Sequence, residues 1–206
     1  MATACSGIIL AGGMATRFSG KPKALLPLGR QCVLDYIFDV YRAVFDDIVL
    51  VANDPVTYQR WDALIVSDLF PDRSSLTGIH AGLFYCRHPY GFISACDTPF
   101  LRAETVTALI GAVEPGVDVV IPETAAGVEP LCAVYSARCL HVIERSLRQR
   151  QFKIQHIFSA VKVRKIPAAD LRQTDPDLRC FFNINTPEDL AAAEALLGEG
   201  ARKLDR

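Results

Sequence analysis

A glycine-containing loop near the start of the chain carries residues that suit a bound polyphosphate. Three apolar residues, Ile8, Ile9 and Leu10, predict a buried strand. This strand is followed directly by Ala11, Gly12 and Gly13. Four cations follow before the first acidic residue of the chain, and these are Arg17, Lys21, Lys23 and Arg30. Glycines allow backbone N–H groups to approach phosphate oxygens closely, and lysines neutralise phosphate charge. The loop therefore predicts a site for a small, highly anionic ligand.

The spacing of this loop excludes two common phosphate-binding motifs. A P-loop requires glycine, four residues and then Gly-Lys followed by Ser or Thr, whereas Gly20-Lys21 is followed by Pro22. The dinucleotide fingerprint GxGxxG is also absent. The residues instead form the pattern LAGGxxxRxxGxxK, which ends at Lys23. This pattern resembles the signature of nucleotidyltransferases with a Rossmann-like core.

Polar side chains also follow three further predicted strands, at the point where each strand ends. They are Asn53 after residues 47–52, Asp68 after residues 63–67 and Asp97 after residues 90–96. Because ligands bind at the carboxyl ends of parallel strands, we expect all three beside the glycine loop. Asn53 could equally read the edge of a base or cap the helix that follows Pro55.

Asp97 is the candidate metal ligand of the chain. A carboxylate at the tip of a central strand is costly unless it is paired or holds a metal ion. Mg²⁺ typically takes one or two carboxylates together with substrate phosphates, so we expect Mg²⁺ as cofactor. The competing interpretation is that Asp97 caps a helix in front of Pro99. Cys96 beside it is interpreted as a small core residue, not a catalytic thiol.

Strand and helix patterns alternate over residues 1–206, which predicts one α/β domain with a three-layer α/β/α, Rossmann-like, mostly parallel sheet. Helical patterns cover residues 33–45, 103–113, 137–150 and 187–197, and a further helix is expected to begin near Gly78, capped by Thr77 or Ser75. Additional strands are expected at residues 117–122, 129–135, 161–166 and 181–185, of which 129–135 suits antiparallel pairing. A polar, frayed tail is expected from about residue 198.

Composition limits the class of protein. Proteins that bind nucleic acids or membrane surfaces usually carry a large positive charge, whereas the net charge here is −1. Neither a nucleic acid nor a membrane is therefore expected as a partner. No apolar stretch reaches 18 residues and no signal peptide is evident. The seven cysteines are scattered without a CxxC pair, which favours reduced thiols and a cytoplasmic location.

Four motifs together resemble molybdenum cofactor guanylyltransferases of the MobA type, over essentially the whole length. They are LAGG at 10–13 with Arg17 and Lys23, LTG at 76–78, CDTPF at 96–100 and NINTPEDL at 183–190. The resemblance implies a GT-A-like nucleotidyltransferase fold. It also implies transfer of GMP from GTP to the phosphate of molybdopterin, with pyrophosphate released, and molybdoenzyme maturation proteins as candidate partners.

The same resemblance implies roles for individual residues. The implied GTP-binding residues are Leu10, Ala11, Gly12, Gly13, Lys23, Asn53, Asp68 and Asp97. Catalysis is assigned to Lys23, Arg17 and Asp97, with Asp97 as the metal ligand and Asn183 and Asn185 as a second site nearby. The chain departs from the family pattern at Val51, where the family has Asn, at Glu129, where it often has His, and at Ser74-Ser75, which replaces Gly-Pro.

Two other functions compete with this one. The first is a cytidylyltransferase of the same superfamily, acting on molybdopterin or on a sugar or polyol phosphate. The second is a non-catalytic module that binds the nucleotide or molybdopterin. The presence of both Lys23 and Asp97 argues against a pure binding module, because binding alone has less need of a metal carboxylate.

Overall fold

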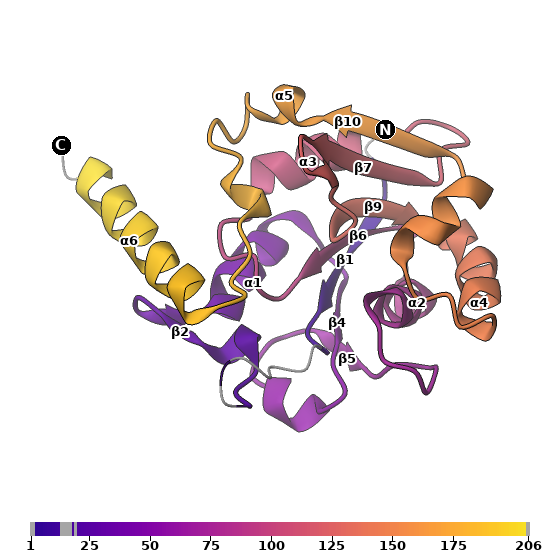
Figure 1. Ribbon diagram of the computed structural model, residues 1–206, viewed down its shortest axis with the longest axis horizontal. Coiled ribbons are helices and arrows are strands. Elements are labelled where there is room, and N and C mark those ends of the chain that lie inside the picture. The colour runs from indigo at the N-terminus through magenta and orange to yellow at the C-terminus, as the bar shows by residue number, and fades with distance from the viewer. Residues whose placement is uncertain (1–2, 13–17, 19, 205–206) are drawn as a thin grey trace.

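A computed structural model of the chain describes residues 3–12, 18 and 20–204, with side chains to residue 198. Its central sheet has eight strands in the order β10-β7-β9-β6-β1-β4-β5, with β8 paired to β7 (Figure 1). The strands are β1 Cys5–Leu10, β4 Ile48–Val51, β5 Leu64–Val66, β6 Tyr90–Ala95, β7 Val119–Thr124, β8 Gly127–Val128, β9 Cys132–Ser136 and β10 Val163–Pro167. β9 runs antiparallel to β6 and β7, whereas β6, β1, β4 and β5 are mutually parallel. The predicted mostly parallel sheet is confirmed.

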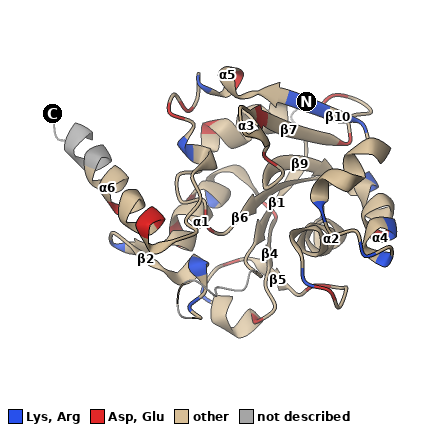
Figure 2. Ribbon diagram, in the orientation of Figure 1, with Lys and Arg blue, Asp and Glu red and all other residues tan. Residues whose placement is uncertain are grey.

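Helices cover both faces of this sheet. They are α1 Val33–Val44, α2 Ser75–Tyr85, α3 Ala103–Gly111, α4 Leu140–Arg148, α5 Ala168–Leu171 and α6 Pro187–Leu204. α1 and α3 lie together on one face, α2 and α4 lie on the other, and each pair encloses its own buried cluster (Figure 1). A short hairpin of β2 (Pro27–Leu28) and β3 (Gln31–Cys32) follows the glycine loop. Basic and acidic residues are interspersed along the outer elements (Figure 2). No helix in the described part of the chain is both long and apolar enough to span a bilayer.

α1 is held in place by a buried apolar face and by two hydrogen bonds. Its apolar residues recur at helical spacing and are buried, among them Ile37, Phe38 and Tyr41. The carboxylate of Asp35 accepts a hydrogen bond from the Cys32 N–H at 2.8 Å, which satisfies an otherwise free donor at the helix start. The Tyr41 hydroxyl donates to the Ile8 carbonyl at 3.0 Å, so α1 is tied directly to the strand that precedes the glycine loop.

α2 packs unusually close to β1, because two glycines leave room for one isoleucine. A Cβ atom on Gly82 would lie 2.3 Å from Ile8 Cγ2, and one on Gly91 of β6 would lie 2.4 Å from Ile8 Cδ1. Real Cβ atoms essentially never approach so closely, so neither position can carry a larger residue unless the neighbouring atoms shift. The close packing brings the start of α2 to the carboxyl edge of the sheet.

The predicted start of this helix is wrong. α2 begins at Ser75 rather than near Gly78, and its cap is Ser74, whose Oγ accepts the Thr77 N–H at 3.1 Å. Thr77 does not cap the helix because its own hydroxyl donates to the Asp72 carbonyl at 2.9 Å. Adjacent hydroxyl residues made the exact cap ambiguous from sequence.

The predicted strand at 181–185 is also wrong. A 3-10 turn at Arg179–Phe181 ends at the first residue of this segment, and the chain then runs irregularly to α6. β6, the strand nearest to it, already pairs with β1 on one side and β9 on the other, so no strand edge is free there. A single backbone hydrogen bond, from the Ile184 N–H to the Asp97 carbonyl at 2.9 Å, attaches the segment instead.

The closing helix is longer than predicted. α6 begins at Pro187, where Thr186 Oγ1 accepts the Asp189 N–H and Asp189 Oδ2 accepts the Thr186 N–H, a capping box as expected. The helix continues to Leu204, so the residues expected as a frayed tail are helical as far as that position. Glu, Ala, Arg, Lys and Leu in this stretch all favour helix, which outweighs the glycines among them.

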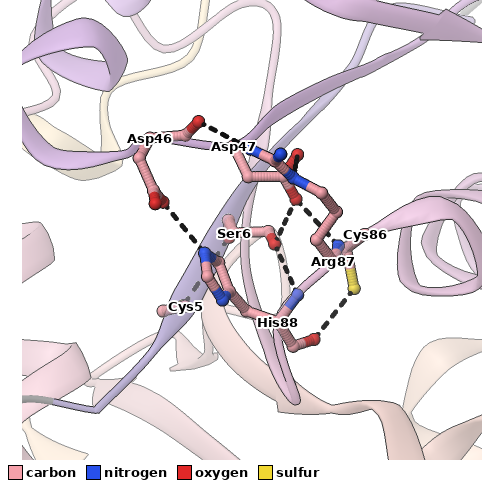
Figure 3. Close-up of polar contacts among 7 residues, drawn as sticks. All are labelled: Cys5, Ser6, Asp46, Asp47, Cys86, Arg87 and His88. Atoms are coloured by element: carbon pink, nitrogen blue, oxygen red, sulfur yellow. Dashed lines mark hydrogen bonds and ion pairs between the residues drawn. The ribbon is translucent and has the colours of Figure 1, made fainter.

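A polar network holds the opposite, amino-terminal edge of the sheet (Figure 3). Asp47, only 7% exposed, accepts hydrogen bonds from the Ser6 hydroxyl at 2.5 Å and from the Arg87 N–H at 2.8 Å. Burial by itself raises the pKa of Asp47, but these hydrogen bonds and the Arg87 guanidinium outweigh it and lower the pKa below its usual value. His88 pairs with Asp46 beside it at 2.9 Å. The network fixes β1, β4 and β6 relative to one another far from the glycine loop.

Candidate active site

A cavity of about 360 Å³ opens at the carboxyl edge of β1, β4, β5 and β6. The predicted site residues that line it are Leu10, Ala11, Gly12, Lys23, Asp68 and Asp97. Leu10, Ala11 and Gly12 end or follow β1, Lys23 comes after the glycine loop, and Asp68 and Asp97 follow β5 and β6, as the parallel arrangement of these strands requires. Gly13 and Arg17 were also predicted for the site and lie outside the described residues.

Lys23 joins the glycine loop to two other motifs. Its ammonium donates to Asp97 Oδ2 at 2.9 Å and to Asn185 Oδ1 at 2.6 Å. The Lys23 and Asp97 side chains are only 23% and 15% exposed, so each charge offsets the cost of burying the other. The Asp97 carboxylate therefore serves this ion pair and does not cap a helix. Asn185 is brought into the site, whereas the Asn183 amide donates to the Phe181 carbonyl at 2.9 Å and has no hydrogen bond to Lys23.

Asn53 and Asp68 form a second polar pair beyond the glycine loop. The Asn53 amide donates to Asp68 Oδ2 at 2.8 Å, and its carbonyl oxygen accepts the Asp68 N–H at 3.3 Å. The turn that follows Pro55 begins at Asp54 and receives no side-chain cap, so Asn53 does not act as a helix cap. Asn53 does not itself line the cavity. It orients Asp68 from behind, and its Nδ2 lies 3.4 Å from where a Cβ on Gly12 would stand.

The residues around Lys23 fit a cation held partly by substrate. Asp97 and Asn185 direct two oxygen atoms at one point, which the Lys23 ammonium now occupies, and oxygen donors of this kind are those that Mg²⁺ prefers. Within the described residues, no group of three or more His, Cys, Asp or Glu side chains could hold a metal. A divalent ion here would therefore complete its coordination with water and phosphate oxygens.

Cys96 contributes a wall of the cavity and no reactive thiolate. Burial, reinforced by the neighbouring Asp97 carboxylate, raises the pKa of the Cys96 thiol to about 12. A thiol with this pKa stays protonated near neutral pH and is a poor nucleophile. The interpretation of Cys96 as a packing residue agrees with this surrounding.

Sequence reasoning assigned no site role to several residues that line the cavity, although it noted Val51 and Ser74-Ser75 as departures from the family pattern. The polar ones are Arg73, Ser74 and Ser75, and the apolar ones include Val51 and Leu131. Arg73 and Ser74 lie on the loop between β5 and α2, which also carries Asp68, and Ser75 is the first residue of α2. The signal that could have found them was their position: a loop that leaves the carboxyl end of one parallel strand must pass the same edge as the others.

The family model for the MobA-like NTP transferase domain matches residues 7–164 of the chain. The chain belongs to this family. The molybdenum cofactor guanylyltransferase of Desulfosudis oleivorans is 50% identical over 197 residues, which cover 96% of this chain and 98% of that protein. The probable molybdenum cofactor guanylyltransferase of Natranaerobius thermophilus is 37% identical, covering 94% of this chain and 97% of its own.

A solved structure extends the likeness of this MobA-like chain to three dimensions. The crystal structure of molybdopterin-guanine dinucleotide biosynthesis protein A from Archaeoglobus fulgidus matches with a TM-score of 0.84 at 29% identity. The match covers 94% of this chain and 99% of that one. The match shows that the two chains share one fold over nearly their full lengths.

Proposed function

We propose that this MobA-like chain transfers GMP from GTP to the terminal phosphate of molybdopterin. The products are molybdopterin-guanine dinucleotide and pyrophosphate. The observation that carries the proposal is the cavity in which Lys23 and Asp97 lie on the β6 side and Asp68 lies on the β5 side. The names of the relatives, guanylyltransferases over nearly the full length, support guanine over cytosine and an enzyme over a binding module.

The reaction needs positioning and charge neutralisation more than proton transfer. An oxygen of the acceptor phosphate attacks the α-phosphorus of GTP, the bond between that phosphorus and the bridging oxygen breaks, and pyrophosphate leaves. The attacking oxygen is already anionic, so no general base is required. Lys23, and Arg17 with it, would neutralise the α-phosphate and the leaving pyrophosphate, and backbone N–H groups near Gly12 and Gly13 would complete the phosphate site.

Mg²⁺ is the cofactor that fits this arrangement. Bound to Asp97, it would supply Lewis-acid stabilisation of charge on the phosphates. Asn185 holds Lys23 in place and offers a second oxygen beside Asp97. Asn183, on the same segment, is proposed to face the acceptor rather than Lys23.

The other end of the cavity would hold the nucleoside. Leu10, Ala11 and Gly12 present backbone at the tip of β1, and Asp68 presents a carboxylate that Asn53 keeps in one orientation. The acceptor would enter beyond β6, toward Leu131. We place the reaction in the cytoplasm, with molybdoenzyme maturation proteins as the partners that receive the product.

Pyrophosphate release tests the function directly. The purified chain is incubated with Mg²⁺, molybdopterin and either GTP or CTP, and pyrophosphate and the dinucleotide product are quantified. We expect product with GTP and little with CTP. Faster turnover with CTP would replace this proposal by the cytidylyltransferase alternative, and nucleotide binding without pyrophosphate release would replace it by the binding module.

A further inference from the structure

Arg73 lines the cavity, and its positive charge is not paired with any acidic residue that the structure describes. It is exposed, lies on the loop between β5 and α2, and lines the cavity beside Asp68, Ser74 and Ser75. Among the described residues, no carboxylate pairs with its guanidinium and no group accepts a hydrogen bond from it. An arginine that meets a ligand cavity with all its donors available is chemically suited to a ligand that offers acceptors.

The loop that carries Arg73 is held in place by contacts on both the N-terminal and the C-terminal side of this residue. Before Arg73, the Phe70 ring packs edge-on against the buried His80 ring, with centroids 5.0 Å apart. The Asp72 carboxylate pairs with Arg150 at 3.3 Å, and its carbonyl accepts the Thr77 hydroxyl. After Arg73, Ser74 caps α2. The backbone at Arg73 is thus held in place, so its side chain can bind with little loss of backbone entropy.

The position of Arg73 along the sheet decides which part of a nucleotide it meets. Lys23 and Asp97 lie at the end of β6, whereas Asp68 and Arg73 follow β5. β6 and β5 are separated by β1 and β4, which amounts to three strand spacings, or roughly 14 Å. If the phosphates lie at Lys23 and Asp97, the base lies at the Asp68 and Arg73 end.

We infer that Arg73 determines the preference for guanine by donating two hydrogen bonds to its O6 and N7 atoms. The inference rests on the proposed function. A guanidinium presents two parallel donors, and O6 and N7 are the adjacent acceptors that guanine alone among the bases offers on that edge. Adenine places an amino donor at the O6 position, which would face the arginine donors. Asp68, at the same end, supplies an acceptor for the N–H donors of guanine.

Nucleotide analogues separate this role from a phosphate contact. Dissociation constants are measured by calorimetry with Mg²⁺ for GTP, 7-deaza-GTP, ATP and CTP, on the wild type and on Arg73→Gln and Arg73→Lys. Arg148→Gln is the matched control, because Arg148 is an exposed arginine of α4 that forms no ion pair with any residue described in the structure. Circular dichroism melting checks that each variant is folded.

We expect Arg73→Gln to weaken GTP binding roughly 10- to 100-fold, the discrimination of one bidentate contact, and to leave ATP and CTP unchanged. Arg73→Lys should recover only part of the loss, because lysine keeps the charge but not the paired donors. 7-Deaza-GTP should bind the wild type more weakly than GTP, and Arg73→Gln should weaken it less than it weakens GTP. Arg148→Gln should change nothing.

Two results would overturn the inference alone. An equal loss for all four nucleotides would assign Arg73 to the phosphates, and unchanged GTP binding in Arg73→Gln would remove it from recognition. Both are compatible with continued GMP transfer, so they leave the proposed function standing. A wild type that binds CTP more tightly than GTP would instead overturn the proposed function, and the inference with it.

Discussion

Lys23 Nζ lies 2.9 Å from Asp97 Oδ2, although the two residues are 74 positions apart. The contact joins the glycine loop to the end of β6 and so unites the two motifs on which the proposed function depends. Before any ligand arrives, the ammonium and the carboxylate neutralise each other. In the proposed reaction, a triphosphate carrying Mg²⁺ would supply new partners for both, because phosphate oxygens attract an ammonium group and a divalent metal ion attracts a carboxylate.

Lys23→Ala and Asp97→Ala should each lower the rate of GMP transfer on the order of 10²–10³-fold, the effect of removing one transition-state contact. Asp97→Asn, which keeps the shape and removes the charge, is the companion variant. Rates come from pyrophosphate release, and circular dichroism shows whether the fold persists. Near-normal rates in well-folded variants would mean that neither residue acts at the reacting phosphates.

Asn185 and Asn183 should differ in importance, because only Asn185 accepts a hydrogen bond from Lys23. Asn185→Ala should lower transfer about tenfold, the worth of one hydrogen bond to a charged group. Asn183→Ala should leave the affinity for Mg·GTP unchanged and lower the affinity for the acceptor substrate, molybdopterin. The measurement is a titration of both substrates on both variants. If Asn183→Ala and Asn185→Ala lost GTP affinity equally, the conclusion that only Asn185 of these two contacts Lys23 would be contradicted.

Gly82→Ala should lower the free energy of unfolding by about 1–3 kcal/mol, because the new methyl group collides with Ile8. Gly198→Ala is the control, because Gly198 lies inside α6 and, apart from α6 itself, no described atom lies within 4 Å of a new Cβ. This substitution should raise stability by about 0.5–1 kcal/mol. Urea unfolding at neutral pH measures both. A stabilised Gly82→Ala protein would show that α2 can move away from β1 without cost.

Asp47 should make stability depend on pH in the acid range. Its pKa is lower in the folded chain than in the unfolded chain, where it is about 3.9. The ionised group therefore stabilises the fold above that value, and this contribution is lost as pH falls through the folded pKa.

Asp47→Asn should accordingly lower the free energy of unfolding by about 1–3 kcal/mol at pH 7, because it weakens the bonds from Ser6 and Arg87. The difference between variant and wild type should shrink as pH falls toward 3. Urea unfolding at several pH values tests this. A difference that stays constant with pH would mean that the charge of Asp47 does not matter.

Sequence reasoning located the site because parallel strands deliver their ends to one edge. Asp68 and Asp97 could be placed by that rule before their neighbours were known, and both line the cavity. Contacts between distant segments were beyond it: nothing in the sequence spacing indicates that Asn185 meets Lys23 while Asn183 turns back to Phe181. The sequence also does not indicate which strand edges are already paired. Residues 181–185 were therefore predicted as a strand, although β6 pairs with β1 on one edge and with β9 on the other.

The contact between Lys23 and Asn185 has a consequence for how the chain is made. The two residues are 162 positions apart, and at about 5–20 residues per second the ribosome needs roughly 8–30 s to travel between them. Asp97 is synthesised during that interval, whereas Asn185 is synthesised only at its end. The hydrogen bonds from Lys23 to Asn185 and from the Ile184 N–H to the Asp97 carbonyl therefore form only after almost the whole chain has been synthesised, so the site is completed late in synthesis.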